Sequence, residues 1–489
     1  MQDYKMLIDG RWVDSSSKVR LDTVNPYNGE VWATIPRGTA ADADSAIRAA
    51  YRALKEGPWG RMLPGQRAEL MRRLADLIAK QSQFLAQVET RDNGKLISET
   101  GAQLRALPSF LHYYAGLADK IEGSVPPPDR TGMFCYTRRE PIGVVVAIVP
   151  WNSPLLQVVS KLGPALAAGC TIVLKPSEFT SASALEFGRL LEVAGFPPGV
   201  INLVTGLGTE IGEALVTHRL VAKIAFTGGE AGGRRVNELA AREFKHVLLE
   251  LGGKSPNIVF ADAKLDAAVN GAISGIFAAS GQTCIAGSRL LLQDSIHDAF
   301  MDKLIGAVRS ARMGDPSLAD TQIGPITTRP QYEKILGYID IAKAEGATCV
   351  LGGRAADRGG QFVEPTIFTD VIHTMRIARE EVFGPVLSVL RFRTVDEAIA
   401  IANNTDFGLA AGLWTENMAT AFVMAERLEV GTVWVNTYRA FGVHMPFGGH
   451  KRSGIGHENG MAAVAGFLQT KSVWMNYGGE TPNPFVMRL

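Results

Sequence analysis

The chain has 489 residues, of which 46% are hydrophobic and 52 are glycine, and this length predicts two or three domains around large buried cores. Lysine and arginine number 50 against 49 acidic residues. That near-neutral balance argues against nucleic-acid and membrane-surface partners, because both require a basic field.

The four cysteines show neither a disulfide framework nor metal-ligand spacing, so they predict a reducing compartment and no metal site. The first residues lack the basic segment and apolar core of a signal peptide. No uncharged apolar run reaches the length of a membrane span. We therefore expect a soluble, cytoplasmic protein.

The N-terminal third is predicted to change from strands to helices. Residues 6–36 combine strand-forming runs with the turn signals Asp9-Gly10 and Asn28-Gly29. Apolar residues then recur at helical spacing over 40–54 and 66–89. Three prolines at 126–128 exclude a helix, and the extended stretch after them predicts a strand excursion towards a partner subunit, with an ordinary surface hairpin as the alternative.

From residue 142 onward, strands alternate regularly with helices. This alternation predicts a parallel sheet covered on both faces, with ligands bound beyond the carboxyl ends of the strands. The predicted strands are 144–149, 171–174, 200–204, 223–226 and 247–249. A second alternating region over about 257–435 predicts a second α/β domain, so the active cleft should lie between the two domains.

Three side chains of this cleft suggest acyl chemistry on a carbonyl. Cys284 follows a small, polar, glycine-led approach that is suited to presenting a nucleophile. Glu250 ends an apolar strand before two glycines, where a general base would reach the cleft. Asn152 closes another buried strand with an amide that can donate to an oxyanion.

A cofactor signal lies at residues 226–233, where a glycine-rich turn joins a strand to a helix. Backbone amides at such a helix start approach a pyrophosphate, although the spacing differs from GxGxxG and an ordinary turn is the alternative. Lys175 and Glu178 follow another strand, where they could hold ribose hydroxyls. Glu178 favours NAD, because a 2′-phosphate would meet its negative charge.

Taken together, these motifs resemble the aldehyde dehydrogenase superfamily over nearly the whole chain, in the family's order and at its usual separations. They are Pro150-Trp151-Asn152, Lys175-Pro176-Ser177-Glu178, Phe226-Thr227-Gly228, Glu250-Leu251-Gly252-Gly253-Lys254, Gly281-Gln282-Thr283-Cys284, Glu380-Glu381-Val382-Phe383-Gly384-Pro385 and Pro446-Phe447-Gly448-Gly449.

The resemblance implies an α/β fold with three parts and a homodimer or homotetramer. A Rossmann-type NAD-binding domain would comprise 1–122 and 142–252, and a second α/β catalytic domain would comprise 253–452. Residues 453–468 would return to the NAD-binding domain. A small β oligomerisation arm would comprise 123–141 and 469–489.

The resemblance also assigns roles to single residues. Cys284 would be the nucleophile, Glu250 the general base, and Asn152 with the Cys284 backbone amide the oxyanion hole. The cofactor, NAD with NADP as the alternative, would contact Ile148, Pro150, Trp151, Lys175, Ser177, Glu178, Gly208, Gly212, Phe226, Gly229, Gly233, Glu381 and Phe383. The aldehyde would contact Gln157, Ser160, Tyr438, Arg439, Phe441 and Phe447.

Departures from the family pattern bear on the ligands. Gly229-Glu230 replaces a common Ser-Thr, which removes a hydroxyl near the pyrophosphate and adds an acid. Ser153, Gln157 and Ser160 stand where bulky apolar residues are frequent, so a roomier and more polar substrate tunnel is expected. Arg439 favours aldehydes with a distal carboxylate or other polar group, an exposed loop arginine being the alternative.

Two other functions compete with oxidation of an aldehyde to a carboxylic acid. Coenzyme A-acylating relatives generally lack the general base, whereas this chain has Glu250. A non-catalytic binding protein on the same scaffold would be expected to lose the nucleophile or the base, and both are present.

Overall fold

The computed structural model describes residues 1–478, 483 and 485. Its larger sheet has eight strands in the order β21-β11-β10-β7-β8-β9-β2-β3. The strands are β21 (Gly454–Ile455), β11 (His246–Glu250), β10 (Val221–Thr227), β7 (Val144–Ile148), β8 (Thr171–Lys175), β9 (Ile201–Leu203), β2 (Met6–Ile8) and β3 (Arg11–Val13). The five strands from β11 to β9 run parallel, as the sequence predicts.

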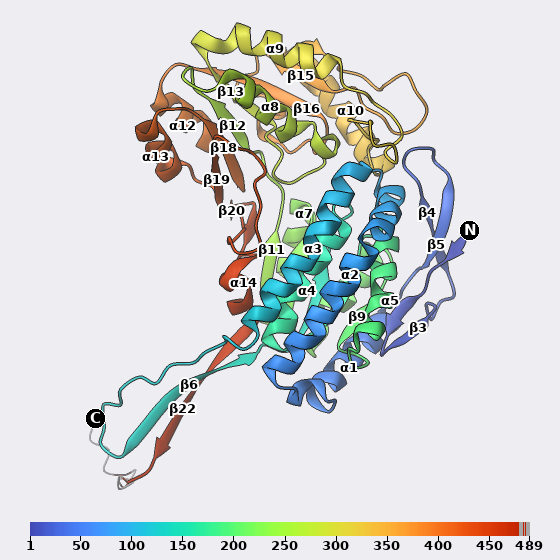
Figure 1. Cartoon of the computed structure of the whole chain (residues 1–489), viewed down its shortest axis with the longest axis vertical. Helices are drawn as coiled ribbons and strands as arrows, with labels where there is room; N and C mark the ends of the chain where they lie inside the picture. The colour runs from blue at the N-terminus through green and yellow to red at the C-terminus, as the bar shows by residue number, and fades with distance from the viewer. Residues whose placement is uncertain (479–482, 484, 486–489) are drawn as a thin grey trace.

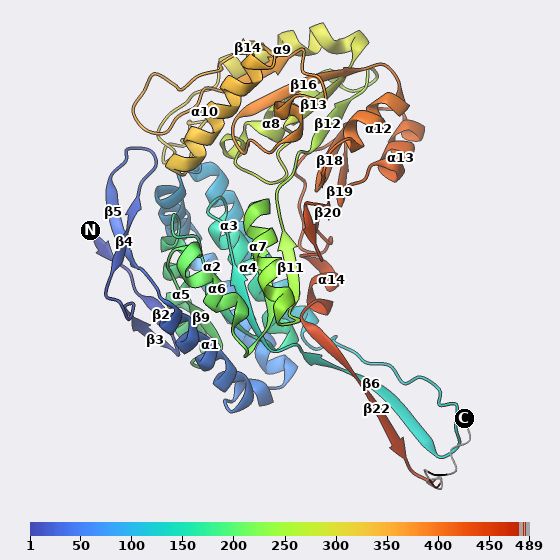
Figure 2. The same ribbon diagram turned by 180° about the vertical axis from the view of Figure 1, so that it is seen from behind.

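Two helical layers cover this sheet and bury its continuous apolar strands on both faces (Figures 1 and 2). One layer holds α2 (Pro64–Asn93), α3 (Ile97–Leu117), α4 (Pro154–Ala168) and α5 (Ala182–Ala194). The other holds α1 (Ala40–Lys55), α6 (Gly208–Thr217) and α7 (Glu230–Arg242). Proline at the first position and a left-handed glycine after the last residue delimit both α2 and α4.

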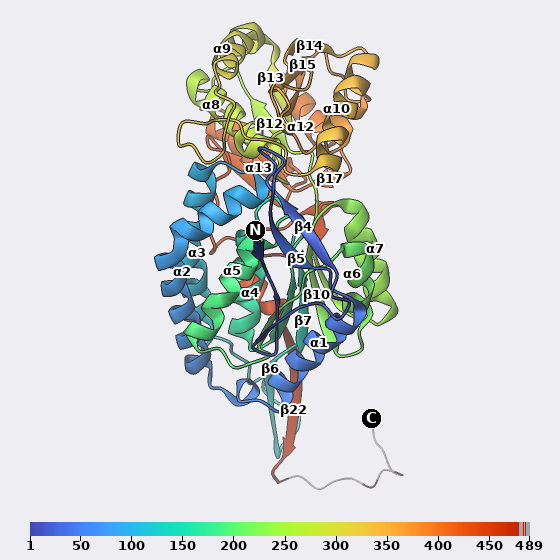
Figure 3. The same cartoon turned by 90° about the vertical axis from the view of Figure 1, so that its right-hand side faces the viewer.

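The second domain is built on a seven-stranded sheet in the order β14-β15-β16-β13-β12-β18-β19. Its strands are β14 (Thr348–Leu351), β15 (Thr366–Thr369), β16 (Val386–Phe392), β13 (Arg289–Gln293), β12 (Pro256–Val259), β18 (Ala410–Trp414) and β19 (Thr432–Val435). Its helices are α8 (Leu265–Ile276), α9 (His297–Arg309), α10 (Arg329–Ala344), α11 (Arg376–Arg379), α12 (Val395–Asn403) and α13 (Met418–Arg427). Figure 3 shows this domain stacked on the end of the first.

Smaller elements complete the chain. Three strands form an N-terminal sheet in the order β1-β5-β4, from β1 (Gln2–Asp3), β5 (Val31–Pro36) and β4 (Arg20–Val24). β17 (Phe407–Gly408) pairs with β20 (His450–Lys451). Because β21 pairs with β11 and α14 (Gly460–Ala465) packs on α4, the segment from β21 to α14 lies against the first domain.

A two-stranded arm projects away from both domains (Figure 1). It is formed by β6 (Met133–Pro141) and β22 (Leu468–Asn476), which pair antiparallel along their whole length. The predicted strand excursion is therefore present. Residues 479–482, 484 and 486–489 of the predicted arm lie outside the described residues.

The structure also contains elements that the periodicity does not predict, namely α3, β15 and β18. α3 lies between α2 and α4, so its apolar residues are not confined to one stripe, and it contains Pro108. β18 is rich in alanine and glycine and is a strand through its pairing with β12 and β19. None of the helices in the described part of the chain has the length and apolar character that a membrane crossing requires.

Candidate active site

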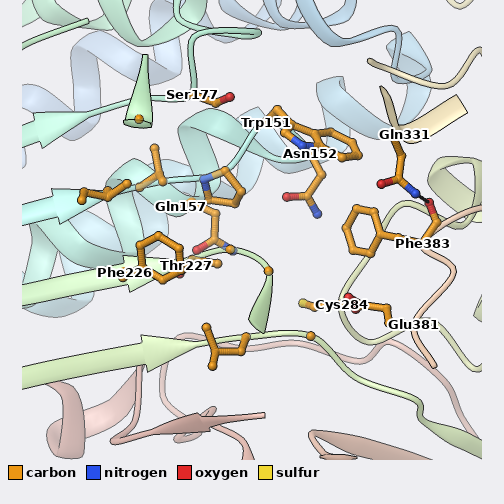
Figure 4. Close-up of a pocket in the computed structure, with 18 of the residues that line it drawn as sticks. Trp151, Asn152, Gln157, Ser177, Phe226, Thr227, Cys284, Gln331, Glu381 and Phe383 are labelled. Atoms are coloured by element: carbon orange, nitrogen blue, oxygen red, sulfur yellow. Dashed lines mark hydrogen bonds between the residues drawn. The ribbon is translucent and has the colours of Figure 1, made fainter. Parts of the chain in front are cut away.

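A cavity of about 330 Å³ lies at the carboxyl edge of the large sheet, facing the second domain (Figure 4). Its walls come from both domains, as predicted. The lining residues include Asn152, Gln157 and Cys284, together with the predicted cofactor residues Ile148, Pro150, Trp151, Lys175, Ser177, Glu178, Gly208, Phe226, Gly229, Glu381 and Phe383. The predicted Gly212 and Gly233 do not line it, and Gly233 instead packs against Leu251.

The sheet end of the cavity fits a dinucleotide. Gly229 precedes the first residue of α7, whose amide groups and helix dipole favour a pyrophosphate. A Cβ added at Gly208 or Gly229 would meet no protein atom within 4 Å, so open space lies beside the backbone there. The Lys175 ammonium, which is buried, lies 3.2 Å from the Glu178 carboxylate, and this pair presents a carboxylate oxygen to a ribose.

Glu230, the acid added by this chain next to the turn, is neutralised by neighbours. Arg234 Nη2 donates to its carboxylate at 2.7 Å, and Arg452 Nη1 lies 3.9 Å away. Glu230 is also absent from the cavity lining. Its charge is therefore held outside the cavity rather than facing the phosphate region.

The opposite end of the cavity is lined by aromatic and acidic groups of both domains. Trp151 and Phe383 pack edge to face with centroids 5.3 Å apart (Figure 4). Gln331 on α10 donates to the carbonyl oxygens of Val382 and Phe383 at 2.7 and 3.0 Å. Glu381 accepts from the Gly253 amide at 3.0 Å, so its carboxylate is fixed against the interdomain strand.

Cys284 is carried by a strained loop. Ala279, Ser280 and Gly281 have φ values of 52°, 51° and 71°, three consecutive left-handed residues. Two interactions hold this conformation: Ser280 Oγ donates to the Gly324 carbonyl at 2.8 Å, and the Ala279 amide donates to Glu99 Oε1 at 2.7 Å. The loop therefore presents Cys284 from a fixed backbone.

The Cys284 side chain is half-buried and its sulfur faces the cavity (Figure 4). Burial raises the pKa of the Cys284 thiol to about 12, and the negative charges of Glu250 and Glu381 add to this effect. The Cys284 thiol is therefore protonated at neutral pH, and a base must remove its proton before attack.

Asn152 lies beside this sulfur at the end of β7. Its Nδ2 donates to the backbone oxygen of Gln282 at 2.9 Å, two residues before the cysteine. One hydrogen of the amide remains for a ligand, and Figure 4 shows the amide turned towards the same cavity as Cys284. Within the described residues the Cys284 backbone N–H donates to no protein acceptor. Both predicted oxyanion donors are thus available.

Glu250 is 3% exposed and lies behind the cavity wall rather than in its lining. Neither of its carboxylate oxygens has a hydrogen-bond partner among the residues described. Burial raises the pKa of Glu250 well above its usual range, the charge of Glu458 raises it further, and Lys161 opposes the shift. The raised pKa makes the carboxylate form of Glu250 a stronger proton acceptor than an exposed glutamate, which suits a general base.

The predicted substrate residues are separated by the structure. Gln157 lines the cavity, where its Oε1 accepts from Lys161 Nζ at 3.2 Å. Ser160 is buried and its hydroxyl donates to the Leu156 carbonyl in its own helix. Tyr438 lies differently from the prediction, because it is buried under the cysteine loop and its hydroxyl donates to the Ile285 carbonyl at 2.9 Å.

Two other predicted substrate residues form an aromatic cluster. Phe441 stacks on Phe110 of α3, with centroids 6.0 Å apart, and packs edge to face with Phe447 at 5.7 Å. Phe441 remains exposed, so this cluster offers an aromatic face to solvent beside Arg439 in the same loop.

Several residues near this site were not predicted from the sequence. Lys95, Lys161 and Glu458 approach the site from α2–α3, α4 and the C-terminal segment. Gln331 and Lys334 line the cavity from α10. In the sequence, only Lys161 stands out among these residues, as a charged residue inside an apolar helical pattern. That pattern does not show that Glu458 is its ion-pair partner.

Comparison with known proteins gives one family. The family model described as "Aldehyde dehydrogenase family" matches residues 12–473. A (Z)-2-((N-methylformamido)methylene)-5-hydroxybutyrolactone dehydrogenase of Acinetobacter baylyi (strain ATCC 33305 / BD413 / ADP1) is 44% identical, over 100% of both chains.

Solved structures agree with this result. A betaine aldehyde dehydrogenase of Staphylococcus aureus in complex with NAD⁺, a point mutant with a modified cysteine, has a TM-score of 0.98 at 41% identity over 100% of both chains. An aldehyde dehydrogenase of Bacillus cereus in an NAD⁺ complex has a TM-score of 0.96 at 43% identity, covering 98% of this chain and 97% of that one.

Proposed function

The chain belongs to the aldehyde dehydrogenase family and oxidises aldehydes to carboxylic acids with NAD, and from this premise we propose which residues carry each step and which aldehydes are preferred. The observation that carries the proposal is the single cavity that Cys284, Asn152 and the predicted cofactor residues line together. Glu250, the proposed general base, is close enough for its charge to raise the Cys284 pKa.

In the first step, the Cys284 sulfur attacks the aldehyde carbon after losing its proton. Because burial and Glu250 hold the pKa of this thiol at about 12, deprotonation needs an acceptor, and Glu250 takes the proton through water. The carbonyl oxygen becomes an oxyanion, which accepts from the Asn152 side chain and the Cys284 backbone N–H. Loss of one such donor typically costs about a hundredfold or more in rate.

The second half of the cycle releases the acid. NAD, when bound, would supply the hydride acceptor for the thiohemiacetal, and Cys284 would then carry a thioester. Lys175 and Glu178 hold the adenosine ribose, whereas Glu381 and Phe383 hold the nicotinamide ribose. Glu250 then removes a proton from water, which attacks the thioester and frees Cys284. The buried carboxyl at this position favours hydrolysis over transfer to coenzyme A.

The substrate that we propose carries a carboxylate or another polar group away from its aldehyde. Arg439 has no acidic partner within 4.0 Å among the described residues, and its Nη1 donates to the Ser274 carbonyl at 3.2 Å. Lys95 is close enough that the positive charge of Arg439 lowers the Lys95 pKa, after burial has done so. The Arg439 guanidinium, without an acidic partner in the described part of the chain, is the group that would favour an anionic or polar end of the substrate.

Arg439→Ala tests the substrate proposal. Catalytic efficiency is compared on an acidic semialdehyde and a neutral aldehyde of equal length, with the exposed Arg393→Ala as the matched control. We expect the acidic-to-neutral ratio to fall about tenfold in Arg439→Ala, the loss of one charge-assisted contact. An unchanged ratio sinks the proposed role of Arg439.

For the assembly, we propose a homodimer or homotetramer joined through the β6–β22 arm. The arm projects from the body and carries the exposed apolar residues Phe134, Trp474 and Met475 (Figure 1). Trp474→Glu should reduce the mass measured by light scattering without changing helix content. A mass unchanged from the wild-type oligomer would refute a contact through this face.

A cytoplasmic location completes the proposal. Cys135, Cys170, Cys284 and Cys349 are all free thiols, which suits a reducing compartment. Titration of four thiols in protein isolated under anaerobic conditions would support this location, and a disulfide in that sample would argue against it.

The chemistry itself is tested by formation of reduced nicotinamide over aliphatic, aromatic, hydroxylated and carboxylated aldehydes, with NAD and with NADP. Cys284→Ala should abolish turnover while it retains cofactor binding. If Cys284→Ala still turned over, the sulfur would not be the nucleophile.

A further inference from the structure

Lys95 is a buried cation without an ion-pair partner. The residue is 7% exposed, and its Nζ donates to Ser153 Oγ at 2.9 Å, to Gln103 Oε1 at 3.0 Å and to the backbone oxygen of Asn152 at 3.5 Å. The charges of Glu99 and Glu89 act on Lys95 and raise its pKa, but within the described chain neither carboxylate lies within 4.0 Å of the ammonium. Burial lowers the Lys95 pKa and the two glutamates offset this only in part, so the fold retains this ammonium against a desolvation penalty.

The backbone of Lys95 is fixed at the junction between α2 and α3. Its amide donates to Asn93 Oδ1 at 2.9 Å, and the Asn93 carbonyl accepts from Thr327 Oγ1 at 2.6 Å. Two residues later the Ile97 amide donates to the Pro316 carbonyl at 2.8 Å. Because Thr327 and Pro316 belong to the second domain, the junction is anchored to both domains, and the ammonium is held at a set position.

The same junction contacts both reacting elements. On one side, Lys95 holds the Asn152–Ser153 turn that begins α4. On the other side, Glu99 Oε1 accepts from the Ala279 amide at 2.7 Å, at the start of the strained loop that carries Cys284. Between them, Asn152 Nδ2 reaches the Gln282 carbonyl at 2.9 Å. A closed chain of contacts therefore links the amide, the junction and the cysteine loop.

We propose that Lys95 is a positioning residue: by holding the Asn152 carbonyl and the Ser153 hydroxyl, it fixes the backbone from which the Asn152 amide faces Cys284 in the cavity (Figure 4). Glu99 holds the loop that carries Cys284, so the junction fixes both the Asn152 turn and the cysteine loop. The inference rests on the oxyanion role proposed for Asn152.

A double-mutant cycle on the full-length enzyme tests it, with Lys95→Met, Asn152→Ala and the double variant. We expect Lys95→Met to lower kcat on the order of tenfold to a hundredfold while the KM for NAD stays within about twofold, because the cofactor residues are untouched. In the Asn152→Ala background the same substitution should change kcat by less than about threefold, since the amide it positions is gone. Lys95→Arg should recover part of kcat.

Lys223→Met is the matched control. Lys223 is also a buried lysine without an acidic partner among the described residues, and its Nζ lies over the Phe467 ring at 5.1 Å, near the amino end of β10. The Lys223→Met substitution should therefore leave kcat unchanged. If Lys95→Met does not fold, Ser153→Ala removes the 2.9 Å acceptor and should show the same non-additivity with Asn152→Ala.

Effects on kcat that multiply fully in the double variant, or a Lys95→Met enzyme with wild-type kcat, would overturn the positioning role. A fully active Asn152→Ala enzyme would instead overturn the oxyanion role proposed for Asn152, and the inference would fall with it. The Asn152→Ala arm therefore separates the two failures.

Discussion

Lys161 Nζ and Glu458 Oε1 lie 2.5 Å apart in an ion pair whose side chains are 0% and 4% exposed. Lys161 also donates to Thr227 Oγ1 at 2.6 Å and to Gln157 Oε1 at 3.2 Å. The two charges act on Glu250 in opposite directions, since Glu458 raises its pKa and Lys161 lowers it. This ion pair therefore tunes the pH at which the proposed base becomes ionised.

Glu458→Gln should shift the acidic limb of the kcat profile to lower pH. A base works only when ionised, so activity is present above the Glu250 pKa and is lost as pH falls through it. Removing Glu458 takes away a charge that raises this pKa and leaves Lys161, which lowers it. The measurement is kcat against pH. An acidic limb that moves to higher pH would contradict the proposed effect of Glu458 on the Glu250 pKa.

The same variant should be less stable. Removing one partner of a buried ion pair leaves an uncompensated charge, which typically costs about 3–5 kcal/mol. Thermal unfolding would measure the loss. The exposed pair of Lys451 and Glu429 supplies the control, and Glu429→Gln should leave Tm essentially unchanged.

Alkylation of Cys284 by iodoacetamide should rise with pH in the enzyme without ligands. The thiolate is the reactive form, so below a pKa of about 12 the rate increases roughly tenfold per pH unit. Glu250→Gln should alkylate faster at pH 9 and yet turn over more slowly, because the Glu250 charge raises the thiol pKa. Slower alkylation of Glu250→Gln would mean that Glu250 already deprotonates the resting thiol. Peptide mass spectrometry assigns the site.

Glu178→Gln should shift cofactor preference towards NADP. The Glu178 carboxylate lines the cavity and would repel a 2′-phosphate, so its neutral isostere should raise the ratio of kcat/KM for NADP over NAD about tenfold. The exposed Glu192→Gln is the control. A ratio equal to that of wild type would place the discrimination elsewhere.

Gly281→Ala should disable the nucleophile. Gly281 has a φ of 71°, and an added Cβ would lie 2.1 Å from the Gly384 carbonyl oxygen. Left-handed backbone costs about 1–2 kcal/mol for an L-residue before that clash is counted. We expect loss of activity and a lower Tm. Gly306→Ala, in α9 with no atom within 4 Å of the new Cβ, should be neutral or stabilising, and equal effects of the two would contradict this view.

Much of the architecture is present in local patterns. The helices over 40–54 and 66–89 appear as α1 and α2, and the predicted parallel strands from 144 to 249 appear in one sheet. Apolar periodicity and glycine or proline punctuation are short-range properties, so they can be recognised in a single sequence. α3 was not predicted, because a helix buried between two others has no single apolar stripe.

The proposed reacting groups Cys284, Glu250 and Asn152 can be recognised in the sequence alone, because each ends or follows a strand or a glycine-rich turn. Tertiary structure alone decided their surroundings. Lys161 meets Glu458 across 297 residues, Lys95 meets Ser153 across 58, and Tyr438 turns under the cysteine loop instead of facing the substrate cavity. The physical reason is that the pKa of a buried group and the aim of an amide depend on charges and hydrogen bonds brought together only by long-range packing.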